Sequence, residues 1–389
     1  MTEQSLYDLA PVLELMLLGV LIAGVPLAWV WHRNRGAGAH RRLQALATLT
    51  LFLTFDLILF GAFTRLTDSG LGCPDWPGCY GTFSPLTAHA EISAAQQAMP
   101  TGPVTHGKAW VEMIHRYLAT TVGVLIIVLT AMAWRQHRRT PLHGAMHPAW
   151  ATFTLFWVCV QGAFGALTVT MKLFPAIVTL HLLGATVLLM LLGVHAVAHQ
   201  QYTTGTLPAA IPAGVRRGLW ACWALVLLQS ALGGWVSTNY AVLACTTFPQ
   251  CQDSWWPVMN FAQAFELWRP LGLQGNGEPI HFDALTAIHY THRLVAYVVI
   301  AALLVLAWTL RQHPALAAQR KWLLGVLALQ FATGLSNVVL DWPLVAAVLH
   351  TGGAAALVLI LTWSLAATRS TATVPNVLHA PQGARRVRT

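Results

Sequence analysis

Nine long apolar runs, separated by polar connections, form the main pattern of the chain. Each run is close to the roughly 20 residues that an α-helix needs to cross a bilayer. The pattern therefore predicts an all-α polytopic membrane protein with nine transmembrane helices. The runs cover about residues 10–31, 43–63, 109–134, 150–171, 174–198, 218–238, 284–310, 321–340 and 344–368.

The charges between the runs predict how the helices are oriented. Basic residues gather in the connections 32–42, 135–148, 199–217 and 311–321 and in the tail after residue 368. Such connections stay in the cytoplasm, whereas the N-terminus carries Glu3 and Asp8 and no basic residue. We expect an N-terminus outside, a C-terminus in the cytoplasm and two long outer loops at about 64–108 and 239–283. This is the topology of an integral protein of a bacterial inner membrane.

The amino-acid composition supports a membrane protein and argues against a nucleic-acid-binding protein. Of the 389 residues, 56% are hydrophobic and 9% are charged, which is too apolar for a soluble protein of this length. The net charge of +9 lies in the clusters that set topology. Basic residues are not interleaved with aromatic ones as in a nucleic-acid groove, so no nucleic-acid partner is expected.

Four of the six cysteines form two pairs at equal spacing in the outer loops. Cys73 and Cys79 open the first loop, and Cys245 and Cys251 open the second. An oxidising compartment and a short gap favour the disulfides Cys73–Cys79 and Cys245–Cys251. A purely structural role and a redox role both remain open. Metal binding is disfavoured because no histidine completes a four-ligand set.

An internal repeat divides the chain. Gln161 and His181 recur 169 residues later as Gln330 and His350, and the cysteine pairs recur after 172 residues. We interpret this as a parallel repeat of two four-helix bundles. The expected regions are an extra N-terminal helix with its basic loop (1–42), a first bundle (43–200), a cytoplasmic linker (201–217), a second bundle (218–368) and a cytoplasmic tail (369–389).

Four histidines of the repeat lie at one depth in the predicted membrane. His115, His181, His292 and His350 each lie about six to eight residues inside the outer end of a helix, which is roughly 10 Å at 1.5 Å per residue. Within each bundle two facing imidazoles suit a flat cofactor between them, and haem with two axial histidines fits a helical bundle. These four residues are therefore candidate ligands of haem iron.

Two arginines directly follow two of these histidines. Arg116 and Arg293 are turned about 100° from the candidate ligands and so cannot be axial ligands themselves. Their guanidinium groups could reach haem propionates near the outer surface, or could extend towards lipid headgroups. Other histidines, among them His89, His106, His137, His143, His147, His313 and His379, are expected in solvated loops and tails.

The two repeats differ beside the candidate ligands. Glu112, three residues before His115, is replaced in the second repeat by His289. A carboxylate in one bundle only indicates a proton acceptor at a catalytic haem site. A simpler role, as an acidic residue that favours the helix N-terminus, is also open.

These motifs together resemble one family. The segment 61–81, GAFTRLTDSGLGCPDWPGCYG, followed by EMIHR at 112–116 and by the His-Arg and Leu-His pairs of the second half, is similar to the haem A synthases, which include bacterial and mitochondrial enzymes. The resemblance covers about residues 43–368. Members have eight helices in two four-helix bundles, so the helix near the N-terminus is an addition.

The resemblance implies an activity and a role for each bundle. The expected reaction is oxidation of the C8 methyl of haem O to the formyl group of haem A by successive hydroxylations, for cytochrome oxidase biogenesis. By position, His292 and His350 would ligate a haem b cofactor, and His115 and His181 would face the substrate haem with Glu112 beside it. Expected partners are haem O as substrate, haem O synthase, cytochrome oxidase assembly factors and a membrane electron acceptor.

Two other classes remain open from the residues alone. A bis-histidine membrane cytochrome b that passes electrons between quinone and an outer thiol or redox partner would show the same four histidines, but would not need Glu112. A thiol oxidase that passes electrons from Cys73 and Cys79 to quinone would explain the outer cysteines, but not the histidines.

Overall fold

The computed structural model describes residues 10–139 and 146–371, and nine helices in these ranges are long and apolar enough to cross a membrane. The predicted all-α class and the nine spans are therefore confirmed. The long helices are α1 (Ala10–Arg33), α2 (Ala39–Leu66), α4 (His106–Arg139), α5 (Ala149–Thr170), α6 (Pro175–Thr204), α7 (Ala213–Thr238), α9 (Phe282–Leu310), α10 (Ala317–Val339, preceded by the 3-10 turn η2, Pro314–Leu316) and α11 (Leu344–Ala366).

Several helices are longer than the apolar runs that predicted them. Helix α4 begins at His106 and ends at Arg139, beyond the predicted 109–134, and α6 continues to Thr204 beyond 198. Arginine and glutamine are good helix formers, so the hydrogen-bonded backbone continues past the apolar segment into polar residues. Helix α6 ends where Gly205 adopts φ 69°.

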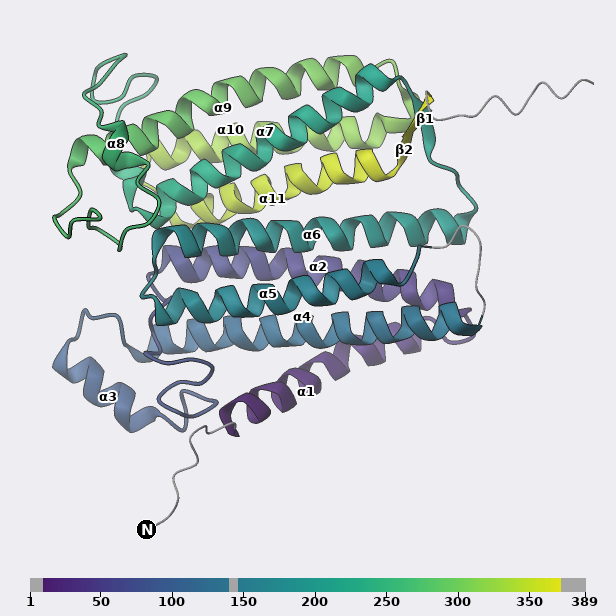
Figure 1. Cartoon of the computed structure of the whole chain (residues 1–389), viewed down its shortest axis with the longest axis horizontal. Helices are drawn as coiled ribbons and strands as arrows, with labels where there is room; N and C mark the ends of the chain where they lie inside the picture. The colour runs from purple at the N-terminus through teal and green to yellow at the C-terminus, as the bar shows by residue number, and fades with distance from the viewer. Residues whose placement is uncertain (1–9, 140–145, 372–389) are drawn as a thin grey trace, which may run out of the picture.

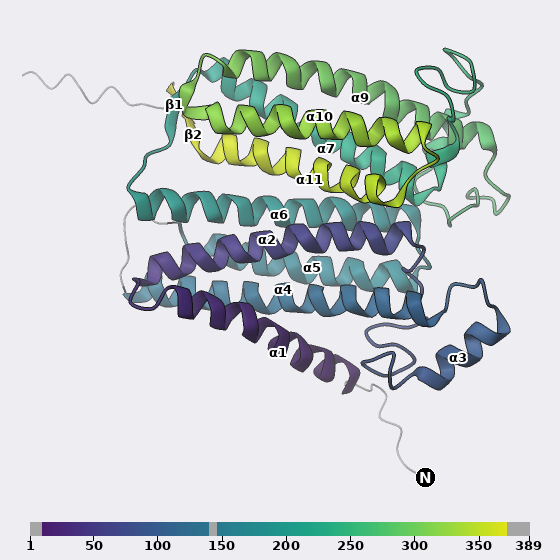
Figure 2. The same ribbon diagram turned by 180° about the vertical axis from the view of Figure 1, so that it is seen from behind.

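The long helices α2 to α11 form two groups (Figures 1 and 2). The first group contains α2, α4, α5 and α6, and the second contains α7, α9, α10 and α11. They meet where α6 packs against α7 and α11, and where α2 packs against α11. Each group has its own apolar core, around Leu125 and Leu192 in the first and Leu303 and Leu361 in the second. Whether the groups are two copies of one repeat stays an interpretation.

Both cysteine loops lie at one end of the molecule (Figure 1). They also contain the short helices α3 (His89–Ala98) and α8 (Phe261–Ala264) and the 3-10 turn η1 (Ala241–Leu243). At the other end, β1 (Ala209–Ile211) pairs in parallel with β2 (Thr368–Ser370). This small strand pair was not predicted, and it joins the linker to the start of the tail.

Helix α1 packs against α4 at the side of the first group (Figure 2). The contact is close because Gly19 faces Thr120, and a methyl group at Gly19 would come within 2.5 Å of the Thr120 Cγ2 atom. The added helix is thus fitted to the first group through a glycine. Residues 1–9, with Glu3 and Asp8, residues 140–145, with His143, and residues 372–389, with most of the predicted tail, lie outside the described ranges.

Candidate functional site

The four repeated histidines lie in two pairs, one in each group. His115 of α4 and His181 of α6 are close enough for electrostatic interaction between their rings, and so are His292 of α9 and His350 of α11. The sequence analysis grouped the same residues from the repeat and from their common depth. All four side chains are only partly buried by protein atoms. Their role as iron ligands stays a prediction.

A glycine of the neighbouring helix faces each of these rings. A methyl group built on each glycine would lie 3.0–3.5 Å from the nearest ring atom, and three of the four distances are shorter than the roughly 3.5 Å at which carbon contacts are favourable. The absence of a Cβ therefore leaves room for the imidazole at each position. The pairs are Gly61 with His115, Gly165 with His181, Gly233 with His292 and Gly334 with His350.

A threonine orients His350 in the second group. Thr333 Oγ1 lies 3.0 Å from His350 Nδ1 and donates its own proton to Leu329 O at 2.8 Å. Since that hydroxyl proton is used, His350 must donate its Nδ1–H to the Thr333 oxygen. The lone pair then resides on Nε2, which is the arrangement usual for a metal-ligating histidine.

A glutamine contacts the other histidine of the second group through its amide nitrogen, which is a donor and not an acceptor. The Gln229 amide nitrogen lies 3.0 Å from His292 Nδ1 and donates to the His292 backbone oxygen, also at 3.0 Å. The sequence analysis missed Gln229 and Thr333. Their residue types do not recur at the equivalent positions of the first repeat, so only the folded structure reveals them.

The first group lacks both of these supports. The positions equivalent to Gln229 and Thr333 are Leu57 and Phe164, which cannot hydrogen-bond a ring. His181 Nδ1 is buried and has no hydrogen-bond partner among the described residues. The two histidine pairs therefore differ in how firmly their rings are held.

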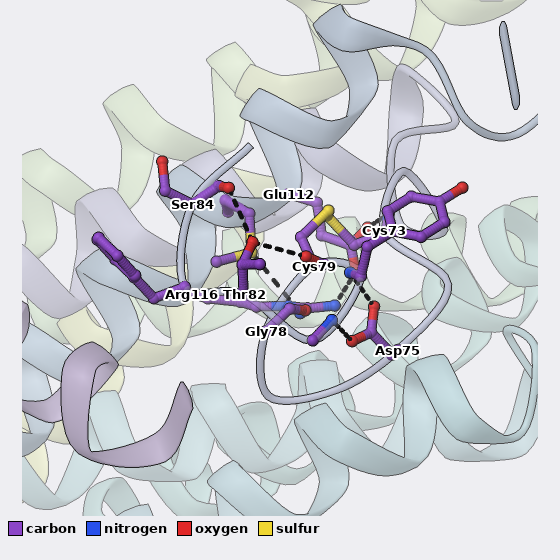
Figure 3. Close-up of a disulfide and its surroundings, with 12 residues drawn as sticks. Cys73, Asp75, Gly78, Cys79, Thr82, Ser84, Glu112 and Arg116 are labelled. Atoms are coloured by element: carbon purple, nitrogen blue, oxygen red, sulfur yellow. Dashed lines mark hydrogen bonds and ion pairs between the residues drawn. A yellow bond between two sulfur atoms is a disulfide. The ribbon is translucent and has the colours of Figure 1, made fainter. Parts of the chain in front are cut away.

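Arg116 and Arg293 bind the cysteine loops. Arg116 donates to Pro77 O at 3.0 Å and to Gly78 O, inside the loop closed by the Cys73–Cys79 disulfide (Figure 3). Arg293 donates to Thr247 O and Gln250 O, both at 2.8 Å, inside the loop closed by Cys245–Cys251. Both predicted disulfides are present.

These contacts differ from the expected contact with propionates. Both arginines are buried, at 9% and 6% exposure, with loop carbonyl oxygens as partners. In each disulfide loop, carbonyl oxygens accept hydrogen bonds from the arginine. The sequence could not show these contacts, because they depend on the folded shape of the loop. A direct role of Arg116 and Arg293 in cofactor binding stays a prediction.

Glu112 connects the first disulfide loop to the helix that carries His115. Its carboxylate accepts the Cys73 N–H at 2.7 Å and pairs with Arg116 at 2.5 Å, and the side chain is 4% exposed (Figure 3). In the second group His289 donates Nδ1–H to Ala241 O at 3.0 Å, and Arg293 lies 3.5 Å from its Nε2. Of these two equivalent positions, 112 and 289, the first has a carboxylate bound to the disulfide loop and the second an imidazole.

A polar contact joins the two groups beside the loops. Arg65 donates to Ser237 O at 2.5 Å and pairs with Asp68, and Tyr240 donates its hydroxyl proton to Asp68 at 2.7 Å. Residues 65 and 68 are separated from residues 237 and 240 by the same 172 positions as the cysteine pairs. Partial desolvation, together with the hydrogen bond to Asp68, raises the pKa of Tyr240 above its usual 10.0.

Known proteins resemble this chain over most of its length. The family model described as Cytochrome oxidase assembly protein matches residues 44–362. A Heme A synthase of Shewanella oneidensis is 38% identical over 82% of this chain and 94% of its own length. Heme A synthases of Halalkalibacterium halodurans and Alkalihalophilus pseudofirmus are 26% and 27% identical, over 80% and 70% of this chain and 92% and 78% of their own lengths.

Proposed function

This chain belongs to the cytochrome oxidase assembly family that includes the haem A synthases, and on that basis we propose how its two helix groups divide the reaction. The chain is a haem A synthase, an oxidoreductase of the membrane that converts haem O to haem A. A methyl group of the porphyrin becomes a formyl group. Oxidation of methyl to alcohol removes two electrons, oxidation of the alcohol to the hydrated aldehyde removes two more, and loss of water leaves the carbonyl.

The second group would hold a resident haem b between His292 and His350. The features that support this are the glycines facing both rings and Thr333, whose oxygen accepts the Nδ1–H of His350. A ligand whose second nitrogen is fixed by hydrogen bonding keeps its ring orientation. Bound there, haem b would supply one-electron redox chemistry.

The first group would hold the substrate haem between His115 and His181. It has the same facing glycines, Gly61 and Gly165, but no described residue hydrogen-bonds His181 Nδ1, and the His115 ring stacks with Phe60 instead. A substrate must enter and its product must leave, so rings that are held less firmly suit this group. The contrast between Thr333 and Phe164 is the observation that carries the division of roles.

Glu112 would act in the first group as the proton acceptor. Its carboxylate lies one helical turn from His115, and two hydrogen bonds fix it. A positioned carboxylate can take protons that leave the substrate as electrons are removed. Arg116, which pairs with it, would hold the loop of Cys73 in place.

The orientation in the membrane is proposed from the charges of the connecting loops, and the partners from the reaction. The disulfide loops would face the outside of a bacterial inner membrane, with the C-terminus in the cytoplasm. A membrane electron acceptor would receive the four electrons. Haem O synthase and cytochrome oxidase assembly factors would act directly before and after this enzyme.

Turnover of haem O by the purified protein tests the proposal. Haem O and a quinone, as the electron acceptor, are added to the wild type, to His181→Ala and to His313→Ala, a control whose histidine lies between α9 and α10. The haem is then extracted and its mass is measured by mass spectrometry. The wild type and His313→Ala should yield haem heavier by about 14 mass units, the change from methyl to formyl, while His181→Ala should not. Equal conversion by His181→Ala would refute the site in the first group, and reversible reduction without any mass change would indicate a cytochrome that only relays electrons.

A further inference from the structure

Five of the 17 histidines meet at the opposite end of the first group, far from the haem ligand candidates. They line a cavity of about 70 Å³, together with Met146. His137 and His147 were expected to be solvated, and His147 is exposed whereas His137 is half-buried. Both also line this cavity, because α4 extends to Arg139 and Pro148 starts the turn into α5. The five are His40 of α2, His137 of α4, His147 before α5, and His195 and His199 of α6.

His195 presents a buried lone pair without a partner. Its side chain is 1% exposed, and Nδ1 has no hydrogen-bond partner among the described residues. Nε2 lies 3.4 Å from Thr154 Oγ1, and Thr154 donates its own proton to Trp150 O at 2.9 Å. His195 must therefore donate Nε2–H to Thr154, which leaves the lone pair on Nδ1. A histidine fixed in this way through its second nitrogen is arranged as metal-ligating histidines are.

His199 and Met146 complete a set of soft and borderline ligands. His199 follows His195 by four residues on the same helix face, and their rings lie nearly parallel, 5.8 Å apart. His40 is a poorer ligand because its Nε2 accepts from the Gln136 amide at 3.3 Å. No three histidine, cysteine, aspartate or glutamate side chains in the described ranges form a metal site by themselves. Met146 also lines the cavity, and its thioether would supply the third donor beside His195 and His199.

The charge of the cavity selects the ion. The described residues that line it include no carboxylate, and Arg135, Arg138 and Arg139 lie at the same end of α4. A dipositive ion would be buried without a compensating negative charge, which costs far more than burying a monopositive one. Imidazole and thioether ligands suit Cu⁺. We propose that His195, His199 and Met146 bind one Cu⁺ ion.

This site is independent of the proposed reaction. His195 is 14 residues after His181 on the same helix, so the two lie about 21 Å apart along α6 at 1.5 Å per residue. Loss of the copper site should therefore leave the haem content unchanged. Haem content therefore serves as a control for folding. A variant that loses haem as well as copper is misfolded, and its absorption spectrum shows this by the missing haem bands.

Competition for Cu⁺ tests the proposal on the full chain. The purified protein is titrated anaerobically with Cu⁺ against a chromogenic Cu⁺ chelator, and the wild type should retain one equivalent. Removing the ligand by His195→Gln should abolish this binding, and removing its orienting acceptor by Thr154→Val should weaken it by about 10- to 100-fold. The variant His313→Ala should bind Cu⁺ like the wild type, because His313 does not line the cavity.

X-ray absorption of the copper-loaded protein then identifies the ligands. The wild type should show one sulfur and two nitrogen neighbours of the copper, and Met146→Leu should lose the sulfur. If His195→Gln does not fold, Met146→Leu still tests the proposal. Equal Cu⁺ retention by the wild type, His195→Gln and Met146→Leu would mean an adventitious ion only and would overturn the proposal. So would a wild type that loses Cu⁺ to the chelator, or one that retains Zn²⁺ in preference.

Discussion

Single side chains distinguish the two candidate haem sites more than their histidines do. The histidines themselves could be found in the sequence because they repeat, and the disulfides because their cysteines repeat in outer loops. Gln229 and Thr333 could not be found, because Leu57 and Phe164 occupy their positions in the first repeat. Their role depends on distances to a ring on another helix, which no spacing in one chain reveals.

The Thr333 hydroxyl should determine how tightly the second group binds its haem. In Thr333→Val the shape is kept, but His350 loses the acceptor for Nδ1–H and its ring is no longer oriented. We expect haem b affinity to fall by about 10- to 100-fold, the usual cost of losing such a support. Titration of the haem-depleted protein measures it. Thr309→Val, which removes a hydroxyl bonded only to backbone in the same group, is the control, and equal losses in both variants would contradict the assignment.

Glu112 should matter for the chemistry more than for haem b binding. Glu112→Gln keeps an acceptor for the Cys73 N–H but loses the basic carboxylate that pairs with Arg116. Haem A formation should fall by at least about 100-fold, as is typical for a positioned acid or base, while haem b remains. Haem types are separated by chromatography, and haem O or the alcohol should accumulate. Normal haem A formation would leave Glu112 only the role of holding the loop.

At the scale of helices, close packing through glycine decides where the imidazoles can lie. Apolar runs predicted every transmembrane helix, yet not its ends, because helices such as α4 continue through arginine and glutamine. Nor could the sequence show that four glycines face four histidines, since each pair joins two helices. The sequence also could not show the partners of Arg116 and Arg293, because these are carbonyl groups whose positions depend on how each disulfide loop folds.

Substitution of a facing glycine should displace its histidine. In Gly334→Ala the new methyl group would lie 3.0 Å from His350 Cε1, so the ring or helix α10 must shift. We expect lower haem b occupancy, measured by the absorbance ratio of haem to protein. Gly325→Ala lies on the same helix with no atom within 4 Å of the added methyl group, and it should keep full occupancy. Equal occupancy in the two variants would show that the close contact has no effect.

In the whole molecule, the two groups are connected by contacts between positions 172 residues apart. The contact of Tyr240 with Asp68 and that of Arg65 with Ser237 lie beside the disulfide loops. Such a pattern is expected where two similar units meet around an axis. The spacing of 172 residues could be found in the sequence, but the contacts themselves could be found only in the folded structure.

Tyr240→Phe should weaken this connection in a pH-dependent way. It removes the hydrogen bond to Asp68, for an expected loss of about 0.5–1 kcal/mol in the free energy of unfolding near neutral pH. Partial desolvation and the hydrogen bond to Asp68 raise the folded pKa of Tyr240 above 10.0, so the unfolded chain ionises first. The stabilisation is therefore fully present below pH 10 and is lost as the pH rises through the folded pKa. Melting temperatures of both proteins at pH 8 and pH 11 measure this. A difference that stays constant across that range would contradict it.

The division of roles between the two groups is tested most directly by typing the haem that each variant keeps. His350→Ala and His181→Ala are purified from cells that make haem O, and the extracted haems are separated by chromatography. If the second group holds haem b and the first holds substrate and product, His350→Ala loses haem b and keeps haem O or A, and His181→Ala shows the reverse. Loss of haem b from His181→Ala with retention by His350→Ala would contradict the account.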